Sequence, residues 1–100
     1  MNRVVESFPR ALAAANRVLL KNKNKDVTKP WADQDPKHHL RHASSHCEEC
    51  FGWKLDVGEE ELVDEQSGEH PAAHAIARLL MYLELLERKK TDVGKTLSDV

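Results

Sequence analysis

The sequence lacks the features of membrane-spanning and exported proteins. No segment approaches the roughly 18 consecutive apolar residues of a membrane-spanning helix, and the first ten residues, MNRVVESFPR, contain no apolar stretch like that of a secretory signal. Two cysteines in 100 residues are too few for a disulfide framework, so Cys47 and Cys50 are expected to be reduced thiols. These absences predict a cytoplasmic protein.

The sequence also lacks several motifs of nucleotide and nucleic-acid chemistry. None of its four glycines forms a phosphate-cradling loop, and it has neither a serine nucleophile elbow nor a basic DNA-reading helix. The net charge is −2, but charge is unevenly distributed along the chain. Residues 1–46 carry nine Lys/Arg and four Asp/Glu, whereas residues 47–70 carry one Lys/Arg and nine Asp/Glu. Residues 71–100 carry five Lys/Arg and four Asp/Glu. An acidic middle segment favours cation binding beside an anionic ligand over a DNA-coating surface, although clustered surface charge explains it equally well.

What the sequence does contain is helical periodicity. Apolar residues recur at helical spacing in three segments, whereas strand-like alternation and internal repeats are missing. We therefore expect an all-α fold, a small helical bundle of three main helices plus a short acidic connecting turn. A single domain is expected over residues 1–100, with 90–100 as a frayed tail. The expected helices cover about Ser7–Lys21, Asp35–Gly52 and Glu69–Glu87, and the turn Glu59–Asp64.

Helix starts are indicated by capping residues and prolines. Ser7 is a plausible N-cap, with Pro9 in the first turn of the first helix. Asp35 precedes Pro36, so the aspartate side chain can accept from free N–H groups while proline occupies the first helical position. The third helix begins around Pro71, again with proline in its first turn.

The second and third helices carry distinct stripes of side chains. The apolar stripe of the second helix comprises Leu40, Ala43, Cys47 and Cys50 or Phe51, and the neighbouring polar stripe comprises His39, His42, His46 and Glu49. The third helix is apolar on nearly all sides, through Ile76, Leu79, Leu80, Met81, Leu83, Leu85 and Leu86. Two short partner helices cannot cover that much apolar surface, so a homo-oligomer formed through the third helix is expected.

All six histidines lie between positions 38 and 74. The pairs His42/His46 and His70/His74 have i, i+4 spacing, which presents imidazole nitrogens on one helix face. Carboxylates that could complete a divalent metal site are Glu49, Asp64, Glu65 and Glu69. Histidine with carboxylate suits zinc, manganese or iron, whereas magnesium prefers oxygen donors, so the ligand set does not identify the metal.

Other interpretations of these residues remain open. The histidines can serve as hydrogen-bonding residues at the edge of the bundle. Cys47-x-x-Cys50 followed by His70 and His74 imitates a zinc-finger formula, but with a longer gap than usual. Both cysteines also stand where the second helix needs small core residues.

The order of these motifs resembles a known family. A tryptophan, then Asp-Pro opening a helix with Arg-His, then an acidic segment, then Asp-x-x-Ser-Gly leading into a histidine-containing, alanine-rich helix, is similar to the phage-associated dATP/dGTP diphosphohydrolase amino-terminal domain. The likeness covers about residues 8–88. The matching pieces are Trp31, Asp35-Pro36, Arg41-His42, Gly58-Glu59, Asp64, Ser67-Gly68-Glu69-His70 and His74-Ala75.

The resemblance implies a phage-encoded, nucleotide-handling helical domain in the host cytoplasm. It would cleave dGTP or dATP between the α- and β-phosphates, releasing monophosphate and pyrophosphate, with a divalent ion such as Mg²⁺, Mn²⁺ or Zn²⁺. By position, the implied metal ligands are His42, Asp64, His70 and His74. Either Glu65 or Glu69 would accept the proton of the attacking water. Arg41, Lys23 and Lys25 would neutralise the phosphates of the purine nucleotide.

Two positions depart from the family pattern and favour alternative functions. Gln66 stands where the family motif usually has a glutamate, and Pro71 stands where the family tends to have a histidine. Glutamine neither ionises nor acts as a base, so nucleotide binding could persist without turnover. A non-catalytic sponge that sequesters a host nucleotide signal is therefore one alternative. A structural helical oligomer is the other.

Overall fold

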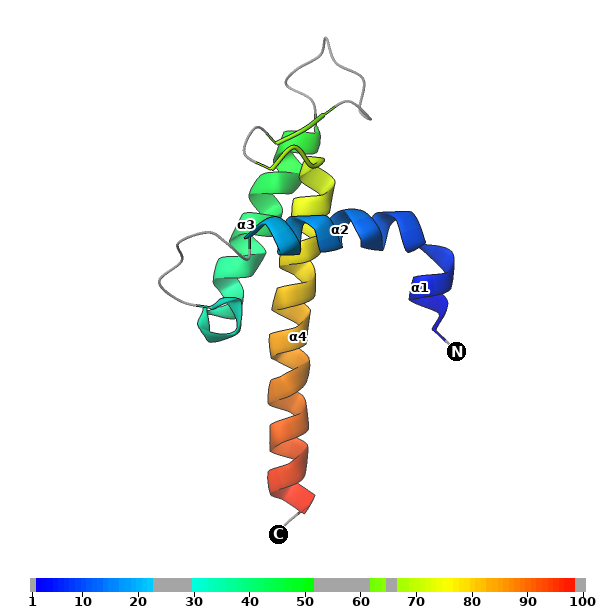
Figure 1. Cartoon of the computed structure of the whole chain (residues 1–100). Helices are drawn as coiled ribbons and strands as arrows, with labels where there is room; N and C mark the ends of the chain where they lie inside the picture. The colour runs from blue at the N-terminus through cyan, green and yellow to red at the C-terminus, as the bar shows by residue number, and fades with distance from the viewer. Residues whose placement is uncertain (1, 23–29, 52–61, 65–66, 99–100) are drawn as a thin grey trace.

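The computed structural model describes residues 2–22, 30–51, 62–64 and 67–98, and this part of the chain contains helices and no β-strand. Figure 1 shows α2 crossing α4 while α3 runs beside the amino-terminal half of α4. The predicted all-α class and helical bundle are confirmed. In chain order the elements are α1 (Arg3–Ser7), α2 (Pro9–Asn22), the 3-10 helix η1 (Trp31–Asp33), α3 (Pro36–Cys50) and α4 (Pro71–Ser98).

The first predicted helix, about Ser7–Lys21, is present as α2, and a short separate helix, α1, precedes it with Phe8 between the two. The side chain of Asn2 caps α1 by accepting from the backbone N–H of Val5 at 3.2 Å. Phe8 lies outside the helical region, with φ −129° and ψ 46°, because Pro9 restricts the residue that precedes it. The prediction that Ser7 caps the first main helix is therefore wrong, since Ser7 is the last residue of α1.

The start of α3 is confirmed, whereas its predicted apolar stripe is buried only at Ala43. Asp35 accepts the backbone N–H of Lys37 at 2.9 Å, and the helix begins at Pro36. The buried residues of α3 are His39 and Ala43, whereas Leu40 is 40% exposed. Cys47 is exposed as well, and the side chain of Phe51, just past the helix, is 87% exposed. His39 therefore packs towards α4 although it is polar, because the carbonyl of Trp31 and the guanidinium of Arg78 satisfy its imidazole.

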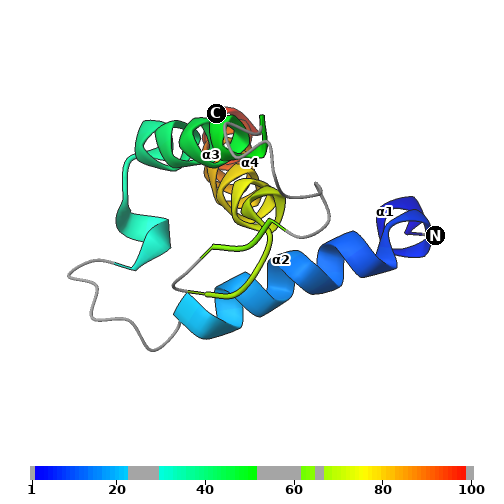
Figure 2. The ribbon, with the colours of Figure 1, turned by 90° about the horizontal axis from the view of Figure 1, so that it is seen from above.

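α4 is the central element, and small residues mark its contacts with the other helices. Its buried apolar residues are Ala73, Ala75, Ala77 and Met81, and α2 contributes Val18 to the core beside Ala73 and Ala77. Alanine at these positions has a small side chain that lets neighbouring helices approach closely. Figure 2 shows α2 and α3 lying against α4 on different sides. As expected, much of the apolar surface of α4 stays uncovered: Leu79, Leu80 and Leu83 are 42%, 45% and 52% exposed.

The carboxyl-terminal part of α4 continues to Ser98, whereas the sequence predicts a frayed tail over 90–100. Ion pairs between residues one turn apart support the helix over residues 84–90. Oε2 of Glu84 lies 2.6 Å from Nε of Arg88, and Oε1 of Glu87 lies 3.3 Å from Nζ of Lys90. None of the helices described combines the length and hydropathy that crossing a bilayer requires.

The segment that leads into α4 is a hydrogen-bonded turn. The backbone N–H of Asp64 donates to the carbonyl of Glu69 at 2.8 Å, and the N–H of Gly68 donates to the carbonyl of Asp64 at 2.7 Å. Gly68 has φ +73°, a left-handed conformation that glycine adopts without strain. Residues 62–64 are not helical, and the other half of the predicted acidic turn, residues 59–61, lies outside the described residues.

Candidate functional site

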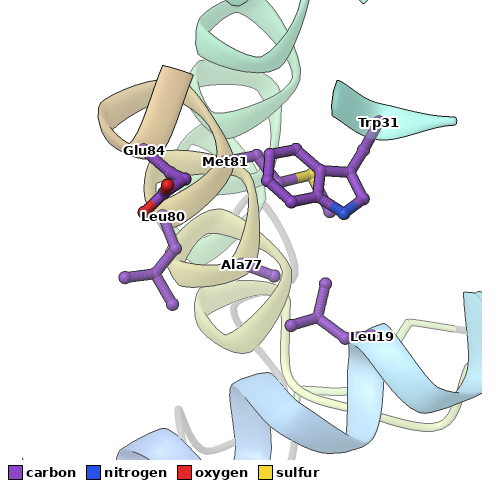
Figure 3. A pocket seen from close by; sticks show the side chains of 6 residues that line it. All are labelled: Leu19, Trp31, Ala77, Leu80, Met81 and Glu84. Atoms are coloured by element: carbon purple, nitrogen blue, oxygen red, sulfur yellow. The ribbon is translucent and has the colours of Figure 1, made fainter. Parts of the chain in front are cut away.

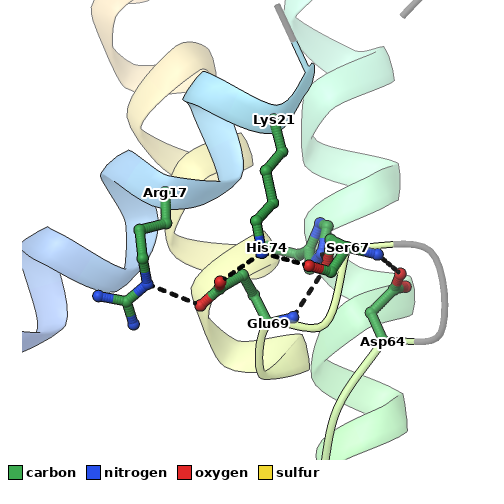
Figure 4. Close-up of polar contacts among 6 residues, drawn as sticks. All are labelled: Arg17, Lys21, Asp64, Ser67, Glu69 and His74. Carbon is green, nitrogen blue, oxygen red and sulfur yellow. Dashed lines mark hydrogen bonds and ion pairs between the residues drawn. The ribbon is translucent and has the colours of Figure 1, made fainter.

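Ser67 is the organising residue of the turn before α4 (Figure 4). Its Oγ lies 2.6 Å from Nε2 of His74 and accepts the backbone N–H of Glu69 at 3.1 Å. The N–H of Ser67 donates to Oδ1 of Asp64 at 3.0 Å. Ser67 and His74 are both buried. The turn is therefore attached to the first full turn of α4 by a short, water-shielded hydrogen bond.

Glu69 attaches the same turn to α2. Its carboxylate lies 2.7 Å from Nζ of Lys21 and 3.0 Å from Nε of Arg17, and Lys21 also donates to the carbonyl of Ser67. The hydrogen bonds from Lys21 and Arg17 lower the pKa of Glu69 below its usual value. A carboxylate with a lowered pKa accepts a proton less readily, so this geometry favours an ion-pairing role over the predicted role of general base.

Three potential metal ligands meet where α3 approaches this turn. One ligand atom from each of His46, Glu49 and Asp64 lies within 4.8 Å of the others. His46 and Glu49 come from adjacent turns of α3, and Nδ1 of His46 lies 3.5 Å from Oε1 of Glu49. Asp64 comes from the turn, where the N–H of Ser67 orients its carboxylate. We call these three residues the His46 cluster.

His74 supports this cluster through its ring. The rings of His46 and His74 are stacked, with centroids 4.7 Å apart and an interplanar angle of 29°. Nε2 of His74 is engaged with Ser67 Oγ. The arrangement gives His74 a positioning role: its ring packs on a cluster residue while its nitrogen contacts the turn that carries Asp64.

A second group of histidines surrounds Arg78. His39 is fully buried, with Nε2 2.9 Å from the carbonyl oxygen of Trp31 and Nδ1 3.0 Å from Nη1 of Arg78. Because a guanidinium only donates, Nδ1 of His39 accepts, and Nε2 carries the proton that the carbonyl accepts. His39 is therefore a neutral imidazole.

The pKa values of this group follow from burial and positive charge. Burial lowers the pKa of His39 below 6.5, and nearby Arg78 and His38 add to the shift, while the bond to the Trp31 carbonyl opposes it. Desolvation, followed by Arg78 and the neighbouring histidines, also lowers the pKa of His42. Arg78 forms no ion pair with any carboxylate in the described part of the chain. Among the described residues, its positive charge is therefore not neutralised by a carboxylate.

The residues implied as metal ligands by the resemblance are distributed among different environments. Asp64 belongs to the His46 cluster. His42 is exposed on α3, and its ring lies 4.4 Å from the ring of His38. His70 accepts the backbone N–H of Ala72 at Nδ1, 2.9 Å away, and so acts at the start of α4. The ring contact that joins α3 to His74 is made by His46, one turn after His42.

The implied catalytic and substrate-binding residues are described only in part. Arg41 is exposed on α3. Glu69 forms the ion pairs with α2 given above. Lys23, Lys25 and Glu65 lie outside the described residues.

Two members of the His46 cluster, His46 and Glu49, are not among the metal ligands that the resemblance implies. His46 and Glu49 were visible in the polar stripe at i, i+3 spacing, but nothing local distinguishes His46 from His42. The zinc-finger alternative gains no support, because the cluster formed by the described residues includes neither cysteine. Cys47 is exposed, and Sγ of Cys50 donates to the backbone carbonyl of His46 at 3.5 Å.

A small pocket lies on another side of α4, where η1 and α2 approach it (Figure 3). Its volume is about 220 Å³, and its walls are apolar except for Glu84. Arg88 stacks over the Trp31 ring, 5.2 Å from its centroid. No residue of the His46 cluster lines this pocket, which therefore does not extend the candidate metal site. The lining residues are Leu19, Trp31, Ala77, Leu80, Met81 and Glu84.

Comparison with other proteins yields no match, whether with family models, curated proteins or solved structures. Evidence for a function therefore comes from the chemistry of the residues just described.

Proposed function

We propose that this protein is a divalent-metal-dependent phosphohydrolase that cleaves a purine deoxynucleoside triphosphate to monophosphate and pyrophosphate. The observation that carries the proposal is the His46 cluster, in which an imidazole and two carboxylates from separate parts of the chain converge within 4.8 Å. The purine specificity and the bond cleaved rest on the resemblance of the motif order to the dATP/dGTP diphosphohydrolase family.

The chemistry of the cluster fits a divalent ion. Nδ1 of His46 is buried and has no hydrogen-bond partner among the described residues. An unsatisfied buried nitrogen is costly, and coordination would satisfy it. One imidazole with two carboxylates suits zinc, manganese or iron better than magnesium. Three protein ligands also leave coordination positions for water and a phosphate oxygen.

The surrounding residues would hold the ligands and the substrate. An ion bound by the cluster would polarise a phosphoryl oxygen and lower the pKa of a bound water. The N–H of Ser67 keeps the Asp64 carboxylate oriented, and the stacked ring of His74 limits rotation of His46. Arg78, four residues after His74 on α4, supplies positive charge for phosphate oxygens.

Metal binding is the first test, and the chain offers a sharp control. Elemental analysis of the purified protein and titration with Zn²⁺ and Mn²⁺ should give one site per chain. His46→Ala and Asp64→Asn should weaken it by more than about 100-fold, beyond the 10- to 100-fold typical of outer-shell residues. His42→Ala should bind as the wild type does. The opposite ranking of His42→Ala and His46→Ala would favour the ligand set implied by the resemblance, and no binding by the wild type would contradict the proposal.

Activity is the second test. With Mn²⁺, Co²⁺ or Mg²⁺, dGTP and dATP should yield monophosphate and pyrophosphate, and His46→Ala should abolish turnover. A thermal shift with dGTP, followed by recovery of unaltered nucleotide from the denatured protein, would instead identify a sequestering protein. Gln66, in place of the family's glutamate, favours that alternative. If no nucleotide yields product and none shifts the melting temperature, both functions are excluded.

A further inference from the structure

The face of α4 that points away from α2 and α3 carries a regular apolar stripe. Its members follow one another at alternating steps of four and three residues, the spacing of a coiled-coil seam. Leu79 and Leu83 in its centre are 42% and 52% exposed, and Leu80 beside it is 45% exposed. We call this set the outer stripe. It consists of Ala72, Ile76, Leu79, Leu83 and Leu86.

The chain exposes more surface than a compact monomer of its size. Its accessible surface is 7952 Å² for a mass of 11.4 kDa, whereas about 5,800 Å² is typical of a folded monomer of that mass. Its radius of gyration is 16.0 Å, compared with about 13 Å for a compact domain of 100 residues. Each partner in a stable interface buries roughly 800 Å², and the exposed leucines of the outer stripe offer apolar surface for such a contact.

Much of this extended shape comes from α4 itself. The helix has 28 residues, or about 42 Å at 1.5 Å per residue. Its carboxyl-terminal half extends beyond α2 and α3 (Figure 1), so neither helix can cover that half. A second long helix matches the shape of such a face. In a second copy of this chain, α4 is such a helix.

Charge on α4 selects the direction of pairing. Arg88, Lys89 and Lys90 are consecutive at one end of the stripe, and Arg88 and Lys90 pair with Glu84 and Glu87 of their own helix. Parallel helices would bring two such basic segments together. An antiparallel pair centred near position 81 would separate them by about 24 Å, at 1.5 Å per residue, and would also oppose the helix dipoles.

We propose that two copies of this chain form an antiparallel dimer through the outer stripe. Leu79 of each copy packs against Leu83 of the other, and Ile76 packs against Leu86. The contact is isologous, so it closes at two subunits. The His46 cluster is formed by α3 and the turn before α4, so dimer formation and metal binding can be tested separately.

The dimer is tested by light scattering and sedimentation equilibrium on the full chain at micromolar concentration. The wild type should have twice the monomer mass of 11.4 kDa. Leu79→Glu with Leu83→Glu should be monomeric. Leu40→Glu is the matched control, because Leu40 on α3 is 40% exposed but lies off the stripe, and it should remain dimeric. A monomeric wild type, or a dimer unaffected by the double substitution, would overturn the proposal.

Circular dichroism shows whether the double variant keeps its helices. If it unfolds, Leu83→Ala replaces it, since truncating an exposed side chain leaves the core intact. That variant should raise the dimer dissociation constant at least about tenfold, as expected for a central interface residue. An unchanged dissociation constant counts against the proposal.

Disulfide trapping tests the orientation in a Cys47→Ser, Cys50→Ser background. Chains carrying Leu79→Cys and chains carrying Leu83→Cys are mixed and oxidised. The antiparallel pair should form mainly the mixed disulfide, because positions 79 and 83 of opposite copies face each other. Disulfides between identical chains, with little mixed product, would show parallel pairing and refute the proposed geometry.

Discussion

Ser67→Ala is the most informative single substitution in the turn before α4. It removes the hydroxyl that lies 2.6 Å from Nε2 of His74 and accepts the N–H of Glu69 at 3.1 Å. Ser67 and His74 are 8% and 7% exposed, so water cannot easily replace the lost hydroxyl. The substitution therefore removes one hydrogen-bond contact from each of two polar groups while adding no bulk.

The expected loss of stability follows from these two contacts. Loss of the hydroxyl next to the buried imidazole nitrogen of His74 should cost about 1–3 kcal/mol, and its loss at the less buried N–H of Glu69 about 0.5–1.5 kcal/mol. Together they should lower the free energy of unfolding by about 2–4 kcal/mol, a large share of the 5–15 kcal/mol typical of a folded domain. The melting temperature should fall by roughly 8–32 °C for a domain of this size.

Urea denaturation followed by circular dichroism measures this difference. Ser44→Ala is the control, because Ser44 is exposed on α3 and alanine slightly favours a helix, so its effect should stay within about 0.5 kcal/mol. In a His74→Phe background, the contact between the hydroxyl and the imidazole is already absent, and Ser67→Ala should cost at least about 1 kcal/mol less. A loss for Ser67→Ala no larger than that for Ser44→Ala would refute the role assigned to the hydroxyl.

Three further substitutions test other parts of the fold. Because the pKa of His39 is lowered below 6.5, the unfolded chain gains a proton there at a higher pH than the folded chain. Its contribution to the free energy of unfolding should be complete above pH 6.5 and be lost as the pH falls through the folded-state pKa, and urea titrations of His39→Gln should show a weaker pH dependence. Asp35→Ala should cost about 1 kcal/mol in thermal melts through loss of the α3 cap, whereas a comparable loss for the exposed Asp33→Ala would contradict this assignment. Val18→Ala should cost about 2–3 kcal/mol because the side chain is buried in the core, and Leu20→Ala, at a position 58% exposed, should cost far less by the same measurement.

The starts of the helices could be predicted because they depend on neighbours in sequence. Asp35 and Pro36 act within one turn, and their bonding and backbone preferences need no distant partner. The same local rule failed at Ser7, where the backbone restriction before Pro9 breaks the helix instead. Where two local effects compete, such as capping by Ser7 and the backbone restriction before Pro9, the sequence alone does not predict which one determines the helix boundary.

The packed face of α3 could not be predicted from polarity alone. Leucine and cysteine mark one stripe, but burial of His39 is compensated by Trp31 and Arg78, residues that lie in other elements. A polar side chain costs little to bury once its hydrogen bonds are made. The partners that make those bonds are identified only when η1, α3 and α4 are packed together.

The candidate site divides in the same way. The types of residue that form it, histidines on α3 and an aspartate before α4, are evident from composition and spacing. Its membership is not: His42 and His46 are equivalent in sequence, and only His46 meets Asp64 and stacks on His74. The reason is that one helical turn moves a side chain about 5.4 Å along the axis, which is enough to join or miss a cluster.

By itself, the sequence determined the all-α class, the start of α3, the start of α4 at Pro71 and the surplus of apolar surface on α4, because periodicity and capping act over a few residues. Only the tertiary structure decided which face of α3 is buried, which histidine joins the carboxylates and which side of α4 stays uncovered. Those outcomes depend on contacts between residues far apart in the chain. Such contacts contribute to stability only once the helices have packed together.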